Sequence, residues 1–482
     1  MSKQDKKELR QQIACEWLEE NYLQFGSLRH DVVTDRLQVR CAHNLGDEAI
    51  GRLGERQETW RNLTDKDINT MVCQCVAEKG VNISTNEMWT ALKSDLVPAV
   101  HPLRAWLDGL RPYTADQPDW IDFVASQVKV KPSPESATDR PKGLSERTAC
   151  CQTTTLLDRP YGADRPMNLT GEADLTVSEA NSLASNSSLC ERSKADALWC
   201  ACFKKWFVAM VASWMKDEVV NHTVLVLVGR QGIFKTTWLD NLIPPELRAY
   251  SSKLPLSGQI SKDDRLRLCE NGMLNIDELD AMCGREMNIV KSLLTSTDVN
   301  ERAAYGRLKE RRVRLASFCA STNKREFLTD ITGNRRWLPF EVESIQNPFH
   351  TIIPYERLYA QAKALVEEGV FSYWFDMEEM EVLEQHNEGF RAQENEEQLL
   401  PILFDVPAEG KGEFMTTAQI SERLVTYGNI KKPMALNRLG MLLGTVGYSK
   451  VNRRIGGCKT RGWLVYQRDT DEINSLKKLL VK

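Results

Sequence analysis

Several features that would place the chain in a familiar class are missing or weak. No run of apolar residues approaches the roughly 18 that a membrane-spanning helix needs, and the first ten residues, MSKQDKKELR, are too polar for a secretory signal. Lys and Arg number 63 against 67 Asp and Glu. This near balance carries no information about nucleic acid, so only local clustering of charge is informative.

Zinc-binding spacing is also missing. The 13 cysteines occur singly or in CQC, CC and CAC groups, no C-x-x-C pair occurs, and histidine appears only six times. A structural zinc site usually needs paired cysteines or histidines, so we expect none. Reduced cysteines are typical of the cytosol. We therefore expect a cytoplasmic protein without a membrane partner.

Composition divides the 482 residues into four parts. Residues 1–130 are expected to form an α-rich accessory domain, mixed or mostly helical, in which DVVTDRLQVR alternates like a short strand pair. Residues 131–195 are rich in Ser, Thr, Pro, Asp and Asn, which is typical of a disordered linker or insert. Residues 196–405 alternate strands and helices, which favours a parallel sheet covered by helices. Residues 410–470 are expected to form a last small domain.

Two helices are predicted from their residue patterns. One has Thr64 or Asp65 as its N-cap and ends at Gly80. The other carries its large apolar residues on one face, which is typical of a helix packed in a core. These residues are Trp199, Phe203, Trp206, Phe207, Met210, Val211 and Trp214.

The segment LVLVGRQGIFKTTWLDNLIP looks like a phosphate-binding loop that lacks one glycine. Phe234 stands where the pattern G-x-x-x-x-G-K-[ST] has its second glycine, and we expect Gly232 to supply the missing flexibility. Backbone N–H groups of such a loop cradle phosphates, Lys235 would reach the β and γ phosphates, and Thr236 would hold Mg²⁺. The residues expected to bind ATP are Gly229, Gln231, Gly232, Ile233, Phe234, Lys235, Thr236 and Thr237.

Two later strands end in polar residues that would complete a nucleotide site. The segment MLNIDELDAM is a short apolar strand ending at Asp277 and Glu278. We assign Asp277 to Mg²⁺ and Glu278 to the base that polarises the attacking water. The alternative is a helix N-terminus at which acids interact with the helix dipole. A further apolar strand, 313–320, is followed by Asn323, whose amide would lie beside that water.

Arg335 and Arg336 follow a Gly-Asn turn in TDITGNRRWLPFEV. An arginine projected into the site of a neighbouring subunit would stabilise the charge of phosphoryl transfer. We favour Arg335 over Arg336, and the alternative is a pair of ordinary surface arginines. A site shared in this way needs a ring, so we expect a homo-oligomer of six subunits.

These segments, in this order, resemble the virulence-associated protein E family, whose ATPase domain is similar to the superfamily 3 helicases of viruses and phages. The likeness is carried by GRQGIFKTTW, LNIDELD, NERAAYGRLKERRVRLASFCASTN and LTDITGNRRWLPFEV. It extends to a C-terminal accessory domain found on Bacteroides-type members. The resemblance implies a P-loop NTPase core of the AAA+ or superfamily 3 type, ATP hydrolysis with Mg²⁺, and DNA replication or remodelling in a mobile element. Primase or other replication proteins would then be further partners.

The segment ERAAYGRLKERRVR is the first candidate nucleic-acid contact, because it holds six Lys or Arg against two acids. In helicases of the resembling class, a hairpin at this place in the chain lines the central channel. Tyr305 would stack on a base there, and Arg307 and Lys309 would follow phosphates. The alternative is a basic edge strand that resists aggregation.

The second candidate contact lies near the C-terminus, where residues 423–468 contain ten Lys or Arg and no Asp or Glu. Two predicted helices and a strand pair around Gly456 and Gly457 have the order of a winged helix. The residues expected to contact phosphates are Lys450, Arg453, Arg454, Lys459 and Arg461. The alternative is a solvated basic face.

The sequence therefore predicts an ATP-dependent DNA helicase or translocase that acts as a ring, with single-stranded DNA in its central channel. One alternative is a DNA-binding regulator or scaffold that binds ATP without turning it over, because Phe234 cripples the loop. The other is an ATPase switch in defence or phage interference, in which DNA remodelling is secondary.

Overall fold

The computed structural model describes most of the chain, which divides into two compact units. One unit comprises Met1–Arg325 and Arg335–Asn387, and the other comprises Glu326–Asn334 and Glu388–Lys482. The predicted insert lies outside the described residues from position 133 to 193. Within the described part of the chain, no helix has the length and apolar character needed to cross a bilayer. The described residues are 3–42, 58–132, 194–254, 261–277, 279, 284–301, 310–328, 334–392, 395–407, 412–431, 433–455, 458–469 and 472–473.

Helices and a small sheet form the N-terminal part of the larger unit. Its elements are α1 (Lys3–Leu18), η1 (Glu19–Leu23), β1 (Leu28–Asp31), β2 (Arg36–Ala42), β3 (Glu58–Asn62), α3 (Asp65–Lys79), α4 (Thr85–Leu92) and β4 (Ala99–Val100). The strands form a sheet of order β3-β2-β1-β4. The region combines these helices with a small sheet, and the predicted strand pair is β1 and β2.

Helix α3 begins and ends where its sequence predicts. The Thr64 hydroxyl accepts a hydrogen bond from the backbone N–H of Asp67 at 3.3 Å, and the Asp67 carboxylate accepts one from the backbone N–H of Thr64 at 2.8 Å. This reciprocal pair is a capping box. Gly80 ends the helix with a φ of 66°, a conformation that glycine adopts without steric cost. Local sequence therefore decides both ends.

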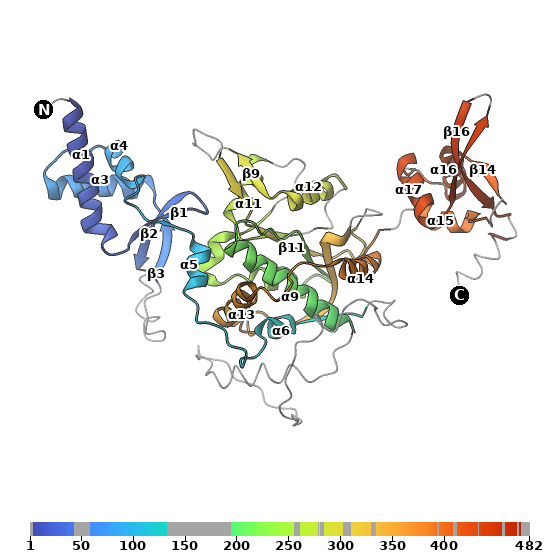
Figure 1. The fold of residues 1–482 in the computed structure, drawn as a ribbon, viewed down its shortest axis with the longest axis horizontal. Coiled ribbons are helices and arrows are strands. Elements are labelled where there is room, and N and C mark those ends of the chain that lie inside the picture. The colour runs from blue at the N-terminus through green and yellow to red at the C-terminus, as the bar shows by residue number, and fades with distance from the viewer. Residues whose placement is uncertain are drawn as a thin grey trace, which may run out of the picture. The chain divides into compact units, whose positions relative to one another are not determined.

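The rest of the larger unit is built on a six-stranded sheet of order β5-β12-β6-β11-β8-β7. All neighbours pair in parallel except β5, which is antiparallel to β12. The predicted parallel sheet is confirmed (Figure 1). The elements are α5 (Pro102–Asp108), α6 (Trp120–Ala125), β5 (Val128–Val130), α9 (Lys194–Met215), β6 (Val224–Val228), α10 (Lys235–Asp240), η3 (Pro245–Tyr250), β7 (Ser251–Lys253), α11 (Lys262–Glu270), β8 (Met273–Ile276), α12 (Gly284–Thr295), β9 (Asp298–Glu301), β10 (Glu310–Val313), β11 (Ser317–Thr322), η5 (Asn334–Arg336), β12 (Trp337–Ile345), α13 (Tyr355–Glu368) and α14 (Met377–Glu388).

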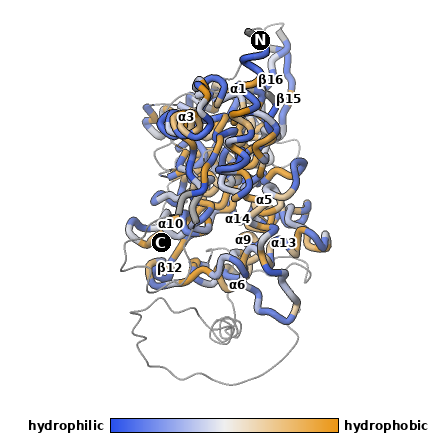
Figure 2. Tube along the Cα trace, turned by 90° about the vertical axis from the view of Figure 1, so that its left-hand side faces the viewer, coloured by the Kyte–Doolittle hydropathy of each residue, from blue (hydrophilic) through white to orange (hydrophobic). Residues whose placement is uncertain are grey.

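Helix α9 supplies much of the core beside this sheet. Trp199, Phe203 and Trp206 are buried as predicted, and every residue from Trp206 to Trp214 is buried. The apolar face expected from the sequence therefore widens to the whole second half of the helix, because α6, α13 and the sheet strands β5 and β6 all contact it. The hydropathy along the trace can be followed in Figure 2.

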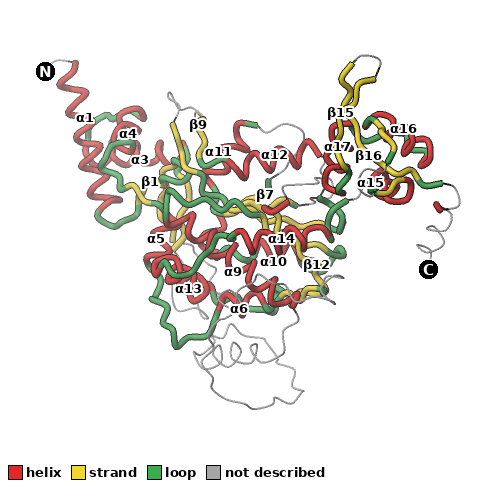
Figure 3. Tube along the Cα trace, turned by 45° about the vertical axis from the view of Figure 1, so that its right-hand side comes forward, coloured by secondary structure: helices red, strands yellow, loops and turns green. Residues whose placement is uncertain are grey.

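The smaller unit carries the predicted order of two helices followed by a strand pair. Its elements are α15 (Asn395–Leu403), β13 (Phe404–Asp405), β14 (Glu413–Met415), α16 (Thr417–Gly428), α17 (Leu436–Val446), β15 (Ser449–Ile455) and β16 (Cys458–Gln467). β15 and β14 both pair with β16. Ile420, Leu439 and Trp463 are buried in its core. Figure 3 shows β15 and β16 as a hairpin that projects beyond the helices.

Candidate nucleotide site

The predicted phosphate loop connects the buried strand β6 to helix α10. The loop begins beside the neighbouring strand, because the backbone N–H of Gly229 donates to the carbonyl oxygen of Thr322 at 3.1 Å. A side chain at Gly229 would meet Ile233 Cδ1 at 3.0 Å and the carbonyl oxygen of Val342 at 3.1 Å. The first glycine is therefore required by close packing of the loop against β12.

Phe234 adopts the backbone conformation for which the phosphate-loop pattern has a glycine. Its φ is 66° and its ψ is 18°, in the left-handed region, where a residue other than glycine costs roughly 1–2 kcal/mol. Gly232 also has a positive φ, of 83°. We expected Gly232 to take the place of the missing glycine. In the structure Phe234 itself makes the left-handed turn, so Gly232 does not replace that glycine. The Phe234 ring is half-buried and packs edge-on against Phe349, with centroids 6.1 Å apart.

Lys235 is buried at the first position of α10 and links the loop to the end of β11. Its ammonium donates to the carbonyl oxygens of Gly229 and Arg230, each at 2.8 Å, and to Oδ1 of Asn323 at 3.1 Å. An ammonium has three donors, and all three have partners here. Lys235 and Asn323 therefore lie together, as the sequence predicted.

Asp277 and Thr236 also meet, together with two residues that sequence reasoning missed. Oδ1 of Asp277 accepts from the hydroxyls of Thr236 at 3.1 Å and Ser321 at 3.0 Å, and Oδ2 accepts from the Lys253 ammonium at 2.7 Å. Burial raises the pKa of Asp277, but the hydrogen bonds from Lys253, Ser321 and Thr236 outweigh it, and the pKa lies below its ordinary value. Asp277 is thus held as a carboxylate.

The order of the strands brings these groups together. Because β11 lies between β6 and β8 and runs parallel to both, the carboxyl ends of the three strands share one edge. Lys235 follows β6 and its loop, Ser321 lies at the end of β11, Asn323 follows β11, and Asp277 follows β8. Ser321 directly precedes the Thr-Asn pair and could have been found from that position, whereas Lys253 has no sequence signal.

The oxygens at this edge fit a magnesium ion. Mg²⁺ prefers hard oxygen ligands and usually keeps several waters. Thr236 and Asp277 offer a hydroxyl and an ionised carboxylate 3.1 Å apart, and Ser321 adds a second hydroxyl 2.9 Å from that of Thr236. Glu278, the predicted base, lies outside the described residues.

Several other predicted nucleotide-binding residues line the same loop. Gln231 and Gly232 are exposed, and Ile233 and Thr237 are half-buried. Their backbone N–H groups belong to the loop and the first turn of α10. No contact of their side chains is needed for the phosphate-cradling role, which stays a prediction.

Arg335 and Arg336 lie at the other end of the parallel strands, where β12 and β6 begin. They directly precede β12, whose first residue, Trp337, pairs with Val224 at the start of β6. Lys235 lies beyond the other end of β6, which spans about 15 Å at roughly 3.3 Å per residue. The two arginines are thus distant from the site of their own chain, and their delivery by a neighbour stays a prediction.

Strands β9 and β10 pair antiparallel and form the base of the hairpin that we predicted to line a channel. Its tip, with Tyr305, Arg307 and Lys309, lies outside the described residues. Three arginines of the same basic segment, Arg311, Arg312 and Arg314, contact protein groups, and Arg311 forms an ion pair with Asp298 at 2.6 Å. Arg314 is fully buried and donates to backbone carbonyl oxygens, including that of Leu294 at 2.8 Å.

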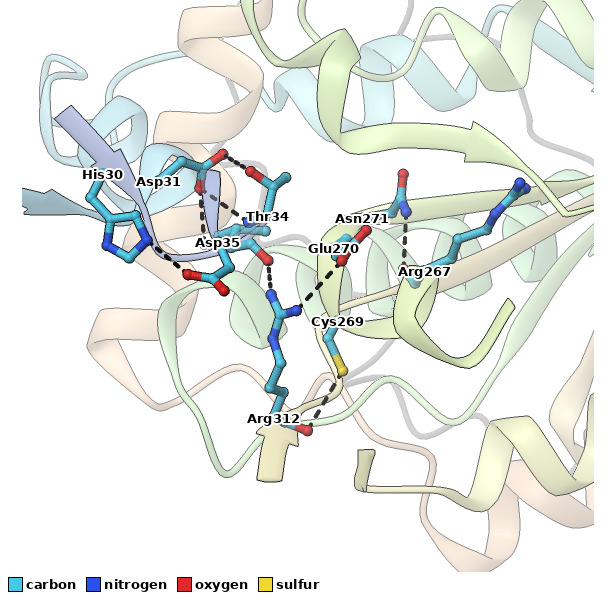
Figure 4. Close-up of polar contacts among 10 residues, drawn as sticks. His30, Asp31, Thr34, Asp35, Arg267, Cys269, Glu270, Asn271 and Arg312 are labelled. Atoms are coloured by element: carbon cyan, nitrogen blue, oxygen red, sulfur yellow. Dashed lines mark hydrogen bonds and ion pairs between the residues drawn. The ribbon is translucent and has the colours of Figure 1, made fainter. Parts of the chain in front are cut away.

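Arg312 joins the base of this hairpin to the N-terminal part of the unit. Its guanidinium donates to the carbonyl oxygen of Val33, in the β1–β2 turn, and forms an ion pair with Glu270 at 3.4 Å (Figure 4). Asp31, the last residue of β1 before this turn, is buried and accepts a hydrogen bond from the Tyr250 hydroxyl at 2.9 Å. The turn and the end of β1 therefore contact the hairpin base and the residue that precedes β7, respectively.

The basic residues of the C-terminal hairpin β15–β16 are exposed, but they do not share one face. Residues directly opposite in an antiparallel pair point to the same side. The register pairs Arg454 with Lys459, and Lys450 and Arg461 lie on the same side of the hairpin. Arg453 points to the other side, where its guanidinium lies 5.3 Å from the centre of the Phe414 ring. Four of the five cations therefore share one side of the hairpin, and the contact of all five with phosphates stays a prediction.

Comparison with known proteins gives one family match and weak structural likenesses. Residues 178–392 match the model of the virulence-associated protein E-like domain. Two apo structures of the NrS-1 C-terminal region align at 9% identity over 92% of this chain, covering 97% and 98% of that chain, with TM-scores of 0.37 and 0.39.

A model of the complex between magnesium chelatase subunits BchI and BchD aligns at 15% identity over 56% of this chain and 95% of that chain, with a TM-score of 0.20. No curated protein matches the chain. The structural likenesses are too weak to carry an argument. The family match includes the segments from which we inferred the resemblance: residues 178–392 match the virulence-associated protein E-like domain.

Proposed function

We propose that the chain is an ATP-dependent DNA helicase or translocase of a mobile genetic element. The observation that carries the proposal is the convergence of Lys235, Asn323, Thr236 and Asp277 at the shared end of β6, β11 and β8. A triphosphate and its metal need an amine, an amide, a hydroxyl and a carboxylate. All four groups lie here beside a glycine-containing loop. The family match supports an ATPase of this kind.

Each residue would have a defined task when ATP binds. Lys235 would exchange the carbonyl oxygens of Gly229 and Arg230 for phosphate oxygens, which are stronger acceptors because they are charged. Thr236 and Asp277 would hold Mg²⁺, which would supply charge neutralisation at the phosphates. Asn323, released from Lys235, would orient the attacking water, and Glu278 would accept its proton.

A ring would complete the site. Arg335 and Arg336 lie at the edge of the sheet opposite Lys235, so either of these two guanidinium groups can stabilise the transition state only if a second copy supplies it. This is the reason for proposing a homo-oligomer, with six subunits as the expected number. Single-stranded DNA would then run through the centre, along the β9–β10 hairpins.

The smaller unit would add a second contact with nucleic acid. Its elements α15, β14, α16, α17, β15 and β16 have the order of a winged helix, with β16 between β14 and β15. Lys450, Arg454, Lys459 and Arg461 are exposed on one side of the hairpin. We propose that they bind backbone phosphates and hold DNA near the ring.

The decisive test is ATP hydrolysis by the full chain with and without single-stranded DNA, with the mass of the assembly measured in the presence of nucleotide. We expect DNA-stimulated hydrolysis that is lost in Lys235→Ala and Glu278→Gln. The matched control is Lys129→Ala, which removes an exposed lysine on β5 from its ion pair with Glu343 and should leave hydrolysis unchanged. Hydrolysis that survives Lys235→Ala would refute the assignment.

Sharing of the site between subunits has its own test. Lys235→Ala and Arg335→Ala chains, each inactive alone, should recover part of the hydrolysis when mixed, because some interfaces then hold an intact lysine and an intact arginine. No recovery at any mixing ratio would refute a shared site.

A second function is favoured by one observation, the left-handed Phe234. A loop that holds a large side chain at this turn is compatible with a DNA-binding scaffold that binds ATP without turnover. In that case the wild type binds ATP and DNA without hydrolysis, and Phe234→Gly restores turnover. Hydrolysis by the wild type would eliminate this alternative.

A further inference from the structure

Lys253 occupies a position at the nucleotide site that neither the sequence motifs nor the family match assigns. It ends the edge strand β7, and its ammonium lies 2.7 Å from Oδ2 of Asp277. The hydroxyls of Thr236 and Ser321 lie at the other oxygen, Oδ1. Both oxygens of the proposed metal ligand therefore have partners from the protein, and one of these partners carries a positive charge.

The backbone of Lys253 is held on both sides. β7 pairs with β8 so that Lys253 lies opposite Asn275, and the next residue, Leu254, donates its N–H to the carbonyl oxygen of Asn275 at 3.0 Å. On the other side, the Arg267 guanidinium donates to the carbonyl oxygen of Lys253 at 2.9 Å. The ammonium thus extends from a fixed point toward Asp277.

The ion pair between Lys253 and Asp277 contributes little to the stability of the fold. The side chains of Lys253 and Asp277 are 57% and 34% exposed, and exposed ion pairs contribute little to folding. The Lys253 ammonium also repels a divalent cation that binds the same carboxylate. This repulsion is larger than the attraction between Lys253 and Asp277 at equal distance, because the energy scales with the product of the charges. The pair therefore bears on metal binding more than on the fold.

We propose, on the basis of the proposed ATPase function, that Lys253 is a positioning residue that competes with Mg²⁺ for Asp277. The ammonium holds Oδ2 and opposes the approach of a cation. Mg²⁺ then binds well only when phosphate oxygens supply further ligands and negative charge. Lys253 in this way makes metal binding depend on the nucleotide and keeps Asp277 from holding a metal alone.

The test measures binding rather than activity. A fluorescent ADP analogue is bound to the full chain and MgCl₂ is titrated at constant ionic strength, for the wild type and for Lys253→Met, Lys253→Gln and Lys253→Arg. We expect half-maximal Mg²⁺-dependent binding at a roughly fivefold lower Mg²⁺ concentration in the two neutral variants, with the difference shrinking as salt rises. Lys253→Arg, which keeps the charge, should stay within twofold of the wild type.

The matched control is Lys129→Met, which removes a similarly exposed lysine from an ion pair of 3.0 Å with Glu343 and lies on β5, the other edge strand of the sheet. It should leave the Mg²⁺ requirement unchanged. An unchanged or higher Mg²⁺ requirement in the neutral Lys253 variants would overturn the role of Lys253 and leave the proposed function intact. A wild type that binds no nucleotide with Mg²⁺ would overturn the proposed function, and the role of Lys253 with it.

Discussion

The conformation of Phe234 leads to a prediction about stability that separates backbone strain from side-chain packing. Phe234→Ala and Phe234→Gly both remove the ring contact with Phe349, so their difference reports only the backbone at φ 66°. Alanine keeps a left-handed cost of about 1–2 kcal/mol, while glycine loses roughly 0.5–1 kcal/mol more chain entropy on folding. Phe234→Gly should therefore be the more stable variant by about 0.5–1 kcal/mol.

Thermal unfolding followed by circular dichroism, without nucleotide, measures this difference as a shift of about 1–3 °C in Tm. Phe349 provides a matched control, because it forms the other half of the same ring pair and is not among the described residues with positive φ. There the order should reverse, with Phe349→Ala more stable than Phe349→Gly. If Phe234→Ala is as stable as Phe234→Gly, the strain argument is wrong.

Three further predictions follow from contacts described above. Tyr250→Phe removes the donor at 2.9 Å to buried Asp31 and should lower the free energy of unfolding in urea by about 1.5–3 kcal/mol. The folded-state pKa of Asp277 is lowered. The ionised carboxylate therefore stabilises the fold above the ordinary carboxyl pKa, and this stabilisation is lost as the pH falls through the lowered folded-state pKa. The Tm of Asp277→Asn should accordingly approach that of the wild type as the pH falls below about 4. Replacing Arg454 and Lys459 together by Gln should reduce the slope of log affinity for duplex DNA against log salt by about 1.8.

Each of these has a result that contradicts it. Tyr373→Phe removes a partly buried tyrosine hydroxyl for which the structure gives no hydrogen bond, and a loss of stability as large as that of Tyr250→Phe would show that the Asp31 contact is unimportant. A Tm difference for Asp277→Asn that is independent of pH would refute the ionised carboxylate. Arg453→Gln, on the other side of the hairpin, should leave the salt slope nearly unchanged, and an equal effect would refute the one-sided surface.

Local features of this protein follow from the sequence because they depend on neighbouring residues. The ends of α3 are decided by Thr64, Asp67 and Gly80, which lie within one helix and its caps. The buried strand before the phosphate loop and the order of the C-terminal elements were predicted from apolar runs and turn residues. Lys235 and Thr236 could be named as site residues because they follow the glycine-containing loop, and Asn323 and Asp277 could be named because each directly follows a predicted strand.

The contacts between these elements were decided only by the tertiary structure. Parallel strands pair across long stretches of chain, so the position of β11 between β6 and β8 has no local signal. The partners Ser321 and Lys253 of Asp277 depend on that order, as does the distance of Arg335 from its own site. Burial likewise makes Arg314, which belongs to the basic segment, a donor to backbone carbonyl oxygens. The sequence determined which groups were present, and the sheet order determined which of them meet, because side chains distant in sequence can interact only where strand pairing brings their ends together.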